Sequence, residues 1–399
     1  MARELANALI PPVPLVPSVP ESLRVTRDNL LEWAKTGGSD QVLPRLVRSL
    51  IAETEPSAEW LHMPAGSAVA SSGWDGIVRC SRGNRYVPAG QSVWELSTKQ
   101  SNSHEKAGAD YAKRVAKTPH DERADLAYVA VVCAPWIKAR EFEQDRTTRG
   151  DFRQVEALNV DSLEDWLECA PATTVWLREQ MGAPVAGIGL LSSWWSKWLE
   201  STRTPLDEGF VLAGREKAAG SLRDRCQQGH GVVTVGGRIH RDEILAFVAA
   251  ALVAADASEA SFGDVLYVTT HDAARRLFAV DALSGNQWRS RLTPALTVVV
   301  PSAEFAEHLP AGSPHRMIVP VPGSTQADIV LGAVDSGLVA QRLRDNRVEL
   351  HTAHQLGGMA RISLKGLRSP LGVAPVLHTR EWEKGKADKM LRRSLLLGG

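Results

Sequence analysis

Tryptophan is distributed unevenly along this chain, and that constrains its domain organisation. Ten of the twelve tryptophans precede residue 200, and only Trp288 and Trp382 follow it. A chain of 399 residues is longer than a single hydrophobic core usually organises, so two or three domains are expected. The change in aromatic content places a boundary between two domains of different character near 202–208.

Composition limits the function classes. Hydrophobic residues make up 44% and charged residues 23% of the chain, which is ordinary for a folded globular protein. The formal net charge is zero, so any nucleic-acid contact must come from a local basic patch or from a partner. The four cysteines are far apart and form no CxxC pair, which favours reduced thiols in a cytoplasmic protein over zinc ligands or disulfides.

Neither end of the chain carries an obvious targeting signal. Residues 1–10 are too charged and too short for a signal peptide, and the longest apolar run, 244–255, is too short to span a bilayer. We therefore expect a cytoplasmic protein with no membrane partner. Residues 1–38 read as an N-terminal arm with a proline-rich linker at 11–20.

The segment 39–200 shows a mixed pattern of helices and strands. Ser39 or Asp40 is expected to cap a helix that continues through Ile51 with apolar residues at helical spacing. Beyond it we expect strands at 74–80, 92–98, 126–133 and 152–160, a helix at 103–117, and a further helix that Ser162 caps. This order predicts an α/β sandwich around a mixed sheet.

The remainder alternates short β-branched runs with helical ones. Strands are expected at 231–235, 265–269, 296–300 and 317–321, and helices at 216–227, 241–255 and 272–277. This alternation predicts a parallel, doubly wound sheet over 208–335. The pattern after about residue 326 is helical, through 329–334, 337–343 and 351–364, so 336–399 is expected to be a helical C-terminal segment.

Two acidic residues lie in apolar strands of the first domain. Asp75 lies in the run Gly73–Val78 and Glu95 in the run Ser92–Lys99, with lysines just beyond. Burying an unpaired carboxylate costs several kcal/mol, so Glu95 indicates function or a paired cation, whereas Asp75 has a turn residue as its alternative. Two carboxylates and a lysine are the minimum chemistry for Mg²⁺-assisted phosphate cleavage.

Together with Lys106-Ala107, Asp110-Tyr111 and Lys113-Arg114, these residues make 39–170 resemble the restriction-endonuclease-like, or PD-(D/E)XK, nucleases. More narrowly, the segment is similar to the nuclease effector domain at the amino terminus of large bacterial antiphage defence proteins. The resemblance implies a core of helix, β-meander, helix and strand, with DNA as the substrate. It implies Asp75 and Glu95 as ligands of Mg²⁺ or Mn²⁺, and Glu53 as a weaker third ligand.

The catalytic lysine is left open. The superfamily places it two residues after the second acid, where this chain has Ser97. Lys99 lies on the same strand side, roughly 13 Å beyond Glu95, and Lys106 on the next helix is an equal candidate. Lys113 and Arg114 are candidates for contact with nucleic acid, and a solvated surface is the alternative for Lys99 and for both of them.

The second domain resembles a P-loop ATPase of the signalling STAND type. The resemblance lies in Leu212–Glu216 and in the strand 232–235 followed by Gly236-Gly237. The chain then continues Arg238-Ile239-His240 without the GK[ST] that holds phosphates, and the strand 297–300 ends without an acid. We therefore expect a degenerate domain that binds no ATP, with Gly236-Gly237 as a plain tight turn. The histidines, among them His230, His240 and His271, show no metal-ligand spacing and read as surface or turn residues.

Two functions follow from these patterns. The first is a metal-dependent nuclease effector, and the alternative is a catalytically inactive adaptor that binds a partner through the degenerate NTPase-like domain. The segment 387–397 has an apolar face with Met390, Leu391 and Leu395. That face indicates a protein partner or a second copy of the chain, or else packing on its own domain.

Overall fold

The computed structural model describes residues 15, 18–65, 73–202, 206–253, 265–283, 295–309 and 311–371. The chain divides into two compact units, 1–195 with 215–332, and 196–214 with 333–399. The first unit carries two mixed sheets, and the described part of the second is helical. The predicted mixed α/β class is therefore confirmed. No helix within the described ranges is long and apolar enough to cross a membrane.

The first sheet is five-stranded, in the order β1-β2-β3-β4-β5. Antiparallel pairing joins β1, β2 and β3, and parallel pairing joins β3, β4 and β5. The strands are β1 (Ala58–His62), β2 (Gly76–Cys80), β3 (Gly90–Ser97), β4 (Ala127–Val132) and β5 (Gln154–Leu158). The helices around them are α1 (Arg27–Ala34), α2 (Ser39–Thr54), α3 (Ser103–Lys117), α4 (His120–Arg123), α5 (Ala139–Arg149), α6 (Val160–Leu167) and α7 (Pro171–Gln180).

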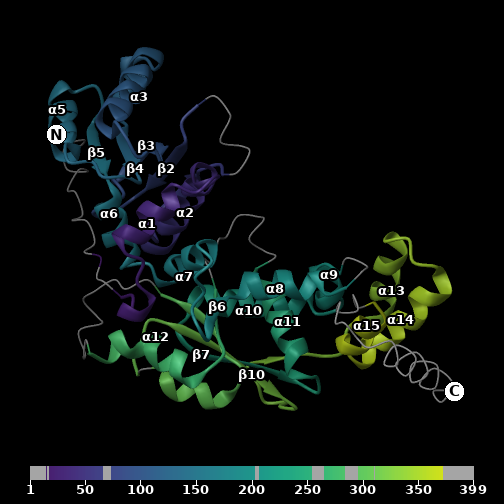
Figure 1. Ribbon diagram of the computed structural model, residues 1–399. Coiled ribbons are helices and arrows are strands. Elements are labelled where there is room, and N and C mark those ends of the chain that lie inside the picture. Colours follow the sequence, from purple (N-terminus) through teal and green to yellow (C-terminus); the bar gives the residue numbers. More distant parts are fainter. Residues whose placement is uncertain are drawn as a thin grey trace, which may run out of the picture. The chain divides into compact units, whose positions relative to one another are not determined.

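Helices cover both faces of this sheet (Figure 1). Strand side chains alternate between faces, and all six residues of β4 are buried. Val129 and Val131 join the hydrophobic cluster of α1, α2, α6 and α7, whereas Tyr128 and Ala130 join that of α3 and α5. A strand buried on both faces explains why 126–133 is apolar without alternation.

The predicted helix and strand positions in this half are confirmed, with differences at their ends. Strand β1 was not predicted, and it completes the meander. Helix α6 begins before Ser162: its cap is Asn159, whose side-chain oxygen accepts the Ser162 N–H at 2.9 Å. Helix α2 is preceded by Gly38 in the left-handed conformation, and the Ser39 hydroxyl donates to the Ala34 carbonyl at 2.8 Å.

The second sheet has six strands in the order β11-β7-β10-β9-β8-β6. All its pairings are parallel except that of β6 with β8. Its strands are β6 (Ile188–Leu190), β7 (Gly231–Gly237), β8 (Leu266–Val268), β9 (Thr297–Val299), β10 (Arg316–Pro322) and β11 (Ile329–Val330). The helical elements are α10 (Glu216–Gln228), α11 (Arg241–Leu252), α12 (His271–Leu283) and the 3-10 helix η5 (Ala303–His308).

Two features of this sheet differ from the sequence-based expectation. The predicted helix at 329–334 is wrong, because Ile329 and Val330 form β11 and pair with Val235 and Gly236 of β7. A short apolar run cannot be assigned to helix or strand by periodicity alone. Strand β6 precedes residue 200 and nevertheless belongs to the second sheet.

The helical unit contains α9 (Glu208–Leu212), α13 (Ser336–Asp345), α14 (Leu350–Ile362), α15 (Leu364–Leu371) and the end of α8 (Leu191–Glu200). The Asp335 carboxylate caps α13 by accepting the N–H groups of Gly337 and Leu338. Helices α13 and α14 approach closely at Gly357, where an added Cβ would lie 2.4 Å from the Ser336 carbonyl oxygen. The predicted docking segment 387–397 and the N-terminal arm before residue 15 lie outside the described residues.

Candidate active site

Asp75 and Glu95 lie opposite one another at the edge of the first meander. The register pairs Gly76 with Trp94, so Asp75, one residue before β2, faces Glu95 of β3. The Asp75 N–H donates to the Trp94 carbonyl at 3.1 Å, and the Leu96 N–H donates to Asp75 Oδ2 at 2.8 Å. Directly opposed residues have Cβ atoms about 4.5–5.5 Å apart. The two carboxylates are therefore neighbours, as the sequence predicted from their strands.

Burial and mutual repulsion perturb both carboxyl groups. The pKa of Glu95 is raised to about 7, first by burial and then by the charge of Asp75, while the hydrogen bond and the charge of Arg114 oppose the shift. The pKa of Asp75 is raised, chiefly by burial, although the Leu96 N–H and the Arg114 charge oppose the shift. Two carboxyls that resist ionisation side by side are stabilised by a cation between them.

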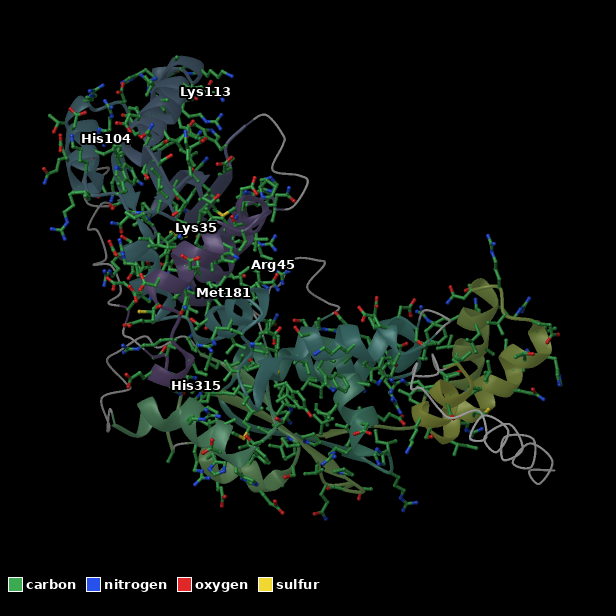
Figure 2. All side chains as sticks on the ribbon, viewed as in Figure 1. Lys35, Arg45, His104, Lys113, Met181 and His315 are labelled. Atoms are coloured by element: carbon green, nitrogen blue, oxygen red, sulfur yellow. The ribbon has the colours of Figure 1, made fainter. Side chains whose placement is uncertain are left out.

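Arg114 supplies a positive charge to this pair. Its Nε donates to Glu95 Oε1, its guanidinium donates to the Gly73 carbonyl, and it lies 4.7 Å above the Trp74 ring. Its side chain is 13% exposed, so it is no solvated surface residue. Lys113, by contrast, is exposed on α3 (Figure 2). The two predicted contacts for nucleic acid therefore differ: Arg114 is directed to the carboxylates, whereas Lys113 is exposed to solvent.

A cavity of about 10 Å³ lies beside Glu95, between the sheet and α3. Its lining includes Ser97, Lys106, Asp110 and Tyr128. Lys106 Nζ lies 2.6 Å and 2.7 Å from the two carboxylate oxygens of Asp110, so the ammonium is held on the face of α3. A volume of this size accommodates about one water molecule. The cavity brings together an acid, an ammonium and room for a water-sized species.

The position of Lys99 differs from that of Lys106. Lys99 is exposed beyond the end of β3, where its N–H donates to the Ser97 hydroxyl at 3.2 Å, and it does not line the cavity. Of the two candidate lysines, Lys106 is therefore the one placed at the cavity beside Glu95.

Tyr128 was not anticipated as part of the site. It is fully buried, and its hydroxyl has no hydrogen-bond partner among the residues that the structure describes. An unsatisfied buried hydroxyl costs about 1–3 kcal/mol. No pattern in the sequence marks this tyrosine, because Tyr128 lies within an apolar strand. Tyr128 therefore presents an unsatisfied polar group at the cavity beside Glu95, which has room for about one water molecule.

Glu53 performs a different task from the predicted one. Its Oε1 and Oε2 accept the backbone N–H groups of Ala172 and Thr173, at 2.9 Å and 2.8 Å, at the beginning of α7. A carboxylate at a helix N-terminus satisfies otherwise free N–H groups and interacts favourably with the helix dipole. The structure thus assigns Glu53 to capping α7 and corrects its prediction as a third metal ligand.

We expect Glu53→Ala to lower the free energy of unfolding by about 1–2 kcal/mol, the usual cost of a lost helix cap. It should leave divalent-metal binding unchanged, because the carboxylate belongs to α7. Urea unfolding and a metal titration of the same variant test both parts. If Glu53→Ala lost much of its metal affinity with little change in stability, Glu53 would instead be a metal ligand.

The raised pKa of Glu95 predicts a pH dependence of stability. The pKa is about 7 in the folded chain against an ordinary value of 4.5, so the folded state binds more protons between these values. Protonated Glu95 therefore contributes to the free energy of unfolding at the acid end of this window. That contribution is lost as pH rises to about 7. We expect the melting temperature of the wild type to fall relative to that of Glu95→Gln across this window. Melting curves that shift in parallel would contradict the assignment.

Gly236 and Gly237 do not form the predicted tight turn, because they are the last two residues of β7 and pair with Val321 and Pro322 of β10. An added Cβ on Gly236 would lie 2.8 Å from the Ser324 carbonyl oxygen, and one on Gly237 would lie 2.3 Å from that of Leu331. The end of β7 is therefore packed closely against backbone, which explains the two glycines. Helix α11 is capped by His240, whose Nδ1 accepts the Asp242 N–H at 3.3 Å.

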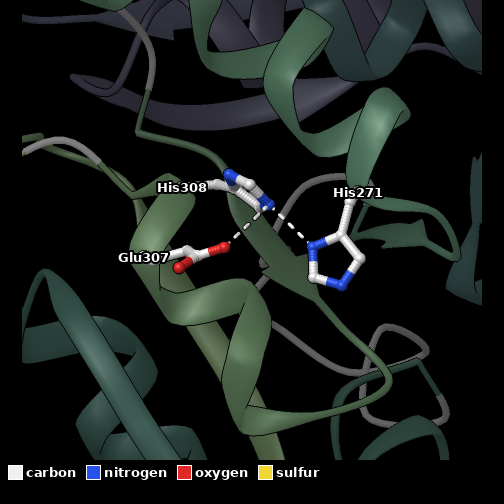
Figure 3. A group of neighbouring side chains, drawn as sticks. All are labelled: His271, Glu307 and His308. Atoms are coloured by element: carbon white, nitrogen blue, oxygen red, sulfur yellow. Dashed lines mark hydrogen bonds and ion pairs between the residues drawn. The ribbon is translucent and has the colours of Figure 1, made fainter.

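Two histidines from α12 and η5, the helices that follow β8 and β9, come together, contrary to the sequence-based interpretation. His271 Nδ1 and His308 Nε2 lie 2.8 Å apart, with Glu307 beside them (Figure 3). Their separation of 37 positions in the sequence conceals this proximity.

Comparisons of the chain with known protein families, with curated proteins and with solved structures found no match.

Proposed function

We propose that this protein is a metal-dependent, nuclease-like effector that hydrolyses DNA phosphodiester bonds in a bacterial antiphage response. The observation that carries the proposal is the opposed pair Asp75 and Glu95, both with raised pKa, beside a cavity that Lys106 lines. The order α2, β1, β2, β3, α3, β4 supports it, because the resemblance implies a helix, a meander, a helix and a strand.

In this proposal Asp75 and Glu95 hold Mg²⁺ or Mn²⁺, which when bound would offset charge on the scissile phosphate. Lys106, positioned by Asp110, donates hydrogen bonds to the attacking water or to a phosphate oxygen. Arg114 offsets the charge of Glu95, and it would have to release Glu95 Oε1 for that oxygen to become a metal ligand. Lys113, exposed on α3, contacts the DNA backbone as a point charge.

The test is incubation of the full chain with supercoiled plasmid in Mg²⁺ or Mn²⁺, with EDTA as the control. The proposal expects conversion to nicked or linear DNA with the metal and none with EDTA. Single-stranded DNA is incubated in the same way. The proposal is contradicted if the plasmid stays supercoiled and the single-stranded DNA stays intact with both ions.

A catalytically inactive adaptor remains the second candidate, and specific observations favour it. Ser97 stands where the resemblance implies lysine, Glu95 is engaged by Arg114, and the two glycines that end β7 pack against the chain's own backbone. In this alternative the Glu95–Arg114 pair is structural, and the NTPase-like domain binds a protein partner without ATP.

A further inference from the structure

We propose that His271, His308 and Glu307 bind a divalent transition-metal ion such as Zn²⁺, independently of Asp75 and Glu95. Among the described residues, this trio is the group of histidine, cysteine and acidic side chains whose ligand atoms all lie within 4.8 Å of one another. Figure 3 shows His308 between the other two, with its Nε2 directed towards both.

The ligand atoms are close to metal-binding separations. His271 Nδ1 lies 2.8 Å and Glu307 Oε1 lies 3.8 Å from His308 Nε2. A tetrahedral Zn²⁺ with bonds of about 2.0–2.1 Å separates its ligands by about 3.3 Å. Both of these separations therefore differ from that of a bound site by about 0.5 Å, and the ligand atoms of His271 and Glu307 lie within 4.8 Å of one another.

The surroundings of His271 hold its ring in the orientation that such a site requires. The ring stacks on Phe305 with centroids 4.0 Å apart and planes at 19°, and Phe305 is buried. On the far side of the ring, Glu304 Oε2 lies 3.9 Å from His271 Nε2. Metal-bound histidines commonly give their other ring N–H to such a carboxylate. His271 thus directs Nδ1 to the ion and Nε2 to Glu304.

The fold places the trio where open α/β sheets bind ligands. His271 begins α12 shortly after β8, and η5 follows β9, the parallel neighbour of β8. The trio therefore lies beyond the carboxyl ends of adjacent parallel strands, the usual location of ligands in such sheets. Two imidazole nitrogens and one carboxylate favour Zn²⁺ over Mg²⁺, and three protein ligands leave a fourth position for water or another ligand.

The experiment is calorimetric titration of the metal-free full chain with Zn²⁺, supported by the visible spectrum of the Co²⁺-loaded chain. We expect saturable binding that His271→Ala and His308→Ala each weaken by at least about 10-fold. Removing the outer carboxylate by Glu304→Gln should weaken it by about 10-fold. His354→Ala, at an exposed position on α14, is the matched control and should bind as the wild type does.

Glu307→Gln guards against misfolding, because the Glu307 side chain is 70% exposed and its replacement leaves the packed rings intact. This variant should retain the wild-type circular dichroism spectrum and bind Zn²⁺ more weakly. The proposal is overturned if the wild type shows no saturable binding, or if Glu307→Gln and both histidine variants bind unchanged. Glu95→Gln should leave the histidine site unaltered, so failure of the nuclease proposal is distinguishable from failure of this one.

Discussion

Glu95→Gln is expected to lose at least about 100-fold in Mg²⁺-dependent plasmid cleavage, because a metal's stabilisation of transition-state charge is worth several kcal/mol. Glutamine preserves the size of the side chain and can still accept from Arg114, but it carries no charge for the ion. Initial rates of nicking at saturating Mg²⁺ measure the loss.

The matched control is Glu156→Gln. Burial also raises the pKa of Glu156, on β5 of the same sheet, to about 7, but Glu156 does not line the cavity beside Glu95. Its replacement should retain wild-type cleavage. Equal losses in the two variants would show that buried charge in the sheet, rather than the Asp75–Glu95 pair, determines activity.

Arg215→Met is expected to destabilise the first unit by about 3–5 kcal/mol, the usual cost of breaking a buried ion pair from one side. Arg215 donates to Glu243 at 2.5 Å and to the Gly332 carbonyl at 2.8 Å, and the side chains of the pair are 1% and 5% exposed. The variant leaves the Glu243 carboxylate buried without its guanidinium. Urea unfolding followed by circular dichroism measures the change.

An exposed pair at the same sheet gives the comparison. Arg225 lies 3.1 Å from Asp328, and these side chains are 50% and 35% exposed, so Arg225→Met should cost less than about 1 kcal/mol. Replacing Arg215 and Glu243 together by methionine should recover much of the stability that Arg215→Met loses. Equal costs for Arg215→Met and Arg225→Met would contradict the structural role of the buried pair.

The spacing of apolar residues predicted the helices and strands whose buried faces are evident from their own sequence. The helical spacing of α2 and the continuous apolar run of β4 follow from which faces they bury, so both are readable from sequence. Strands β1 and β11 lie at sheet edges, and their short sequences bury little apolar surface. Their conformation is decided by the partner strand, which the sequence does not identify.

The candidate site likewise contains residues that local sequence predicts and residues that only tertiary packing identifies. Asp75 and Glu95 were predictable because Glu95 stands out within an apolar strand and Asp75 directly precedes one. The capping role of Glu53 depends on residues 119 and 120 positions away in the sequence. The predicted helix at 103–117 contained Lys106, Asp110 and Arg114, but its sequence could not tell which of these side chains faces Glu95. Only tertiary packing shows that Arg114 does so and that His271 meets His308.

The central claim, that Asp75 and Glu95 jointly hold a divalent ion, is tested most directly by calorimetric titration with Mn²⁺. The titration is made in a chain carrying His308→Ala, so that the histidine trio does not contribute. We predict one class of site that Asp75→Asn and Glu95→Gln each weaken by at least about 10-fold and that Glu156→Gln leaves unchanged. Equal Mn²⁺ affinity in all of these chains would contradict the claim.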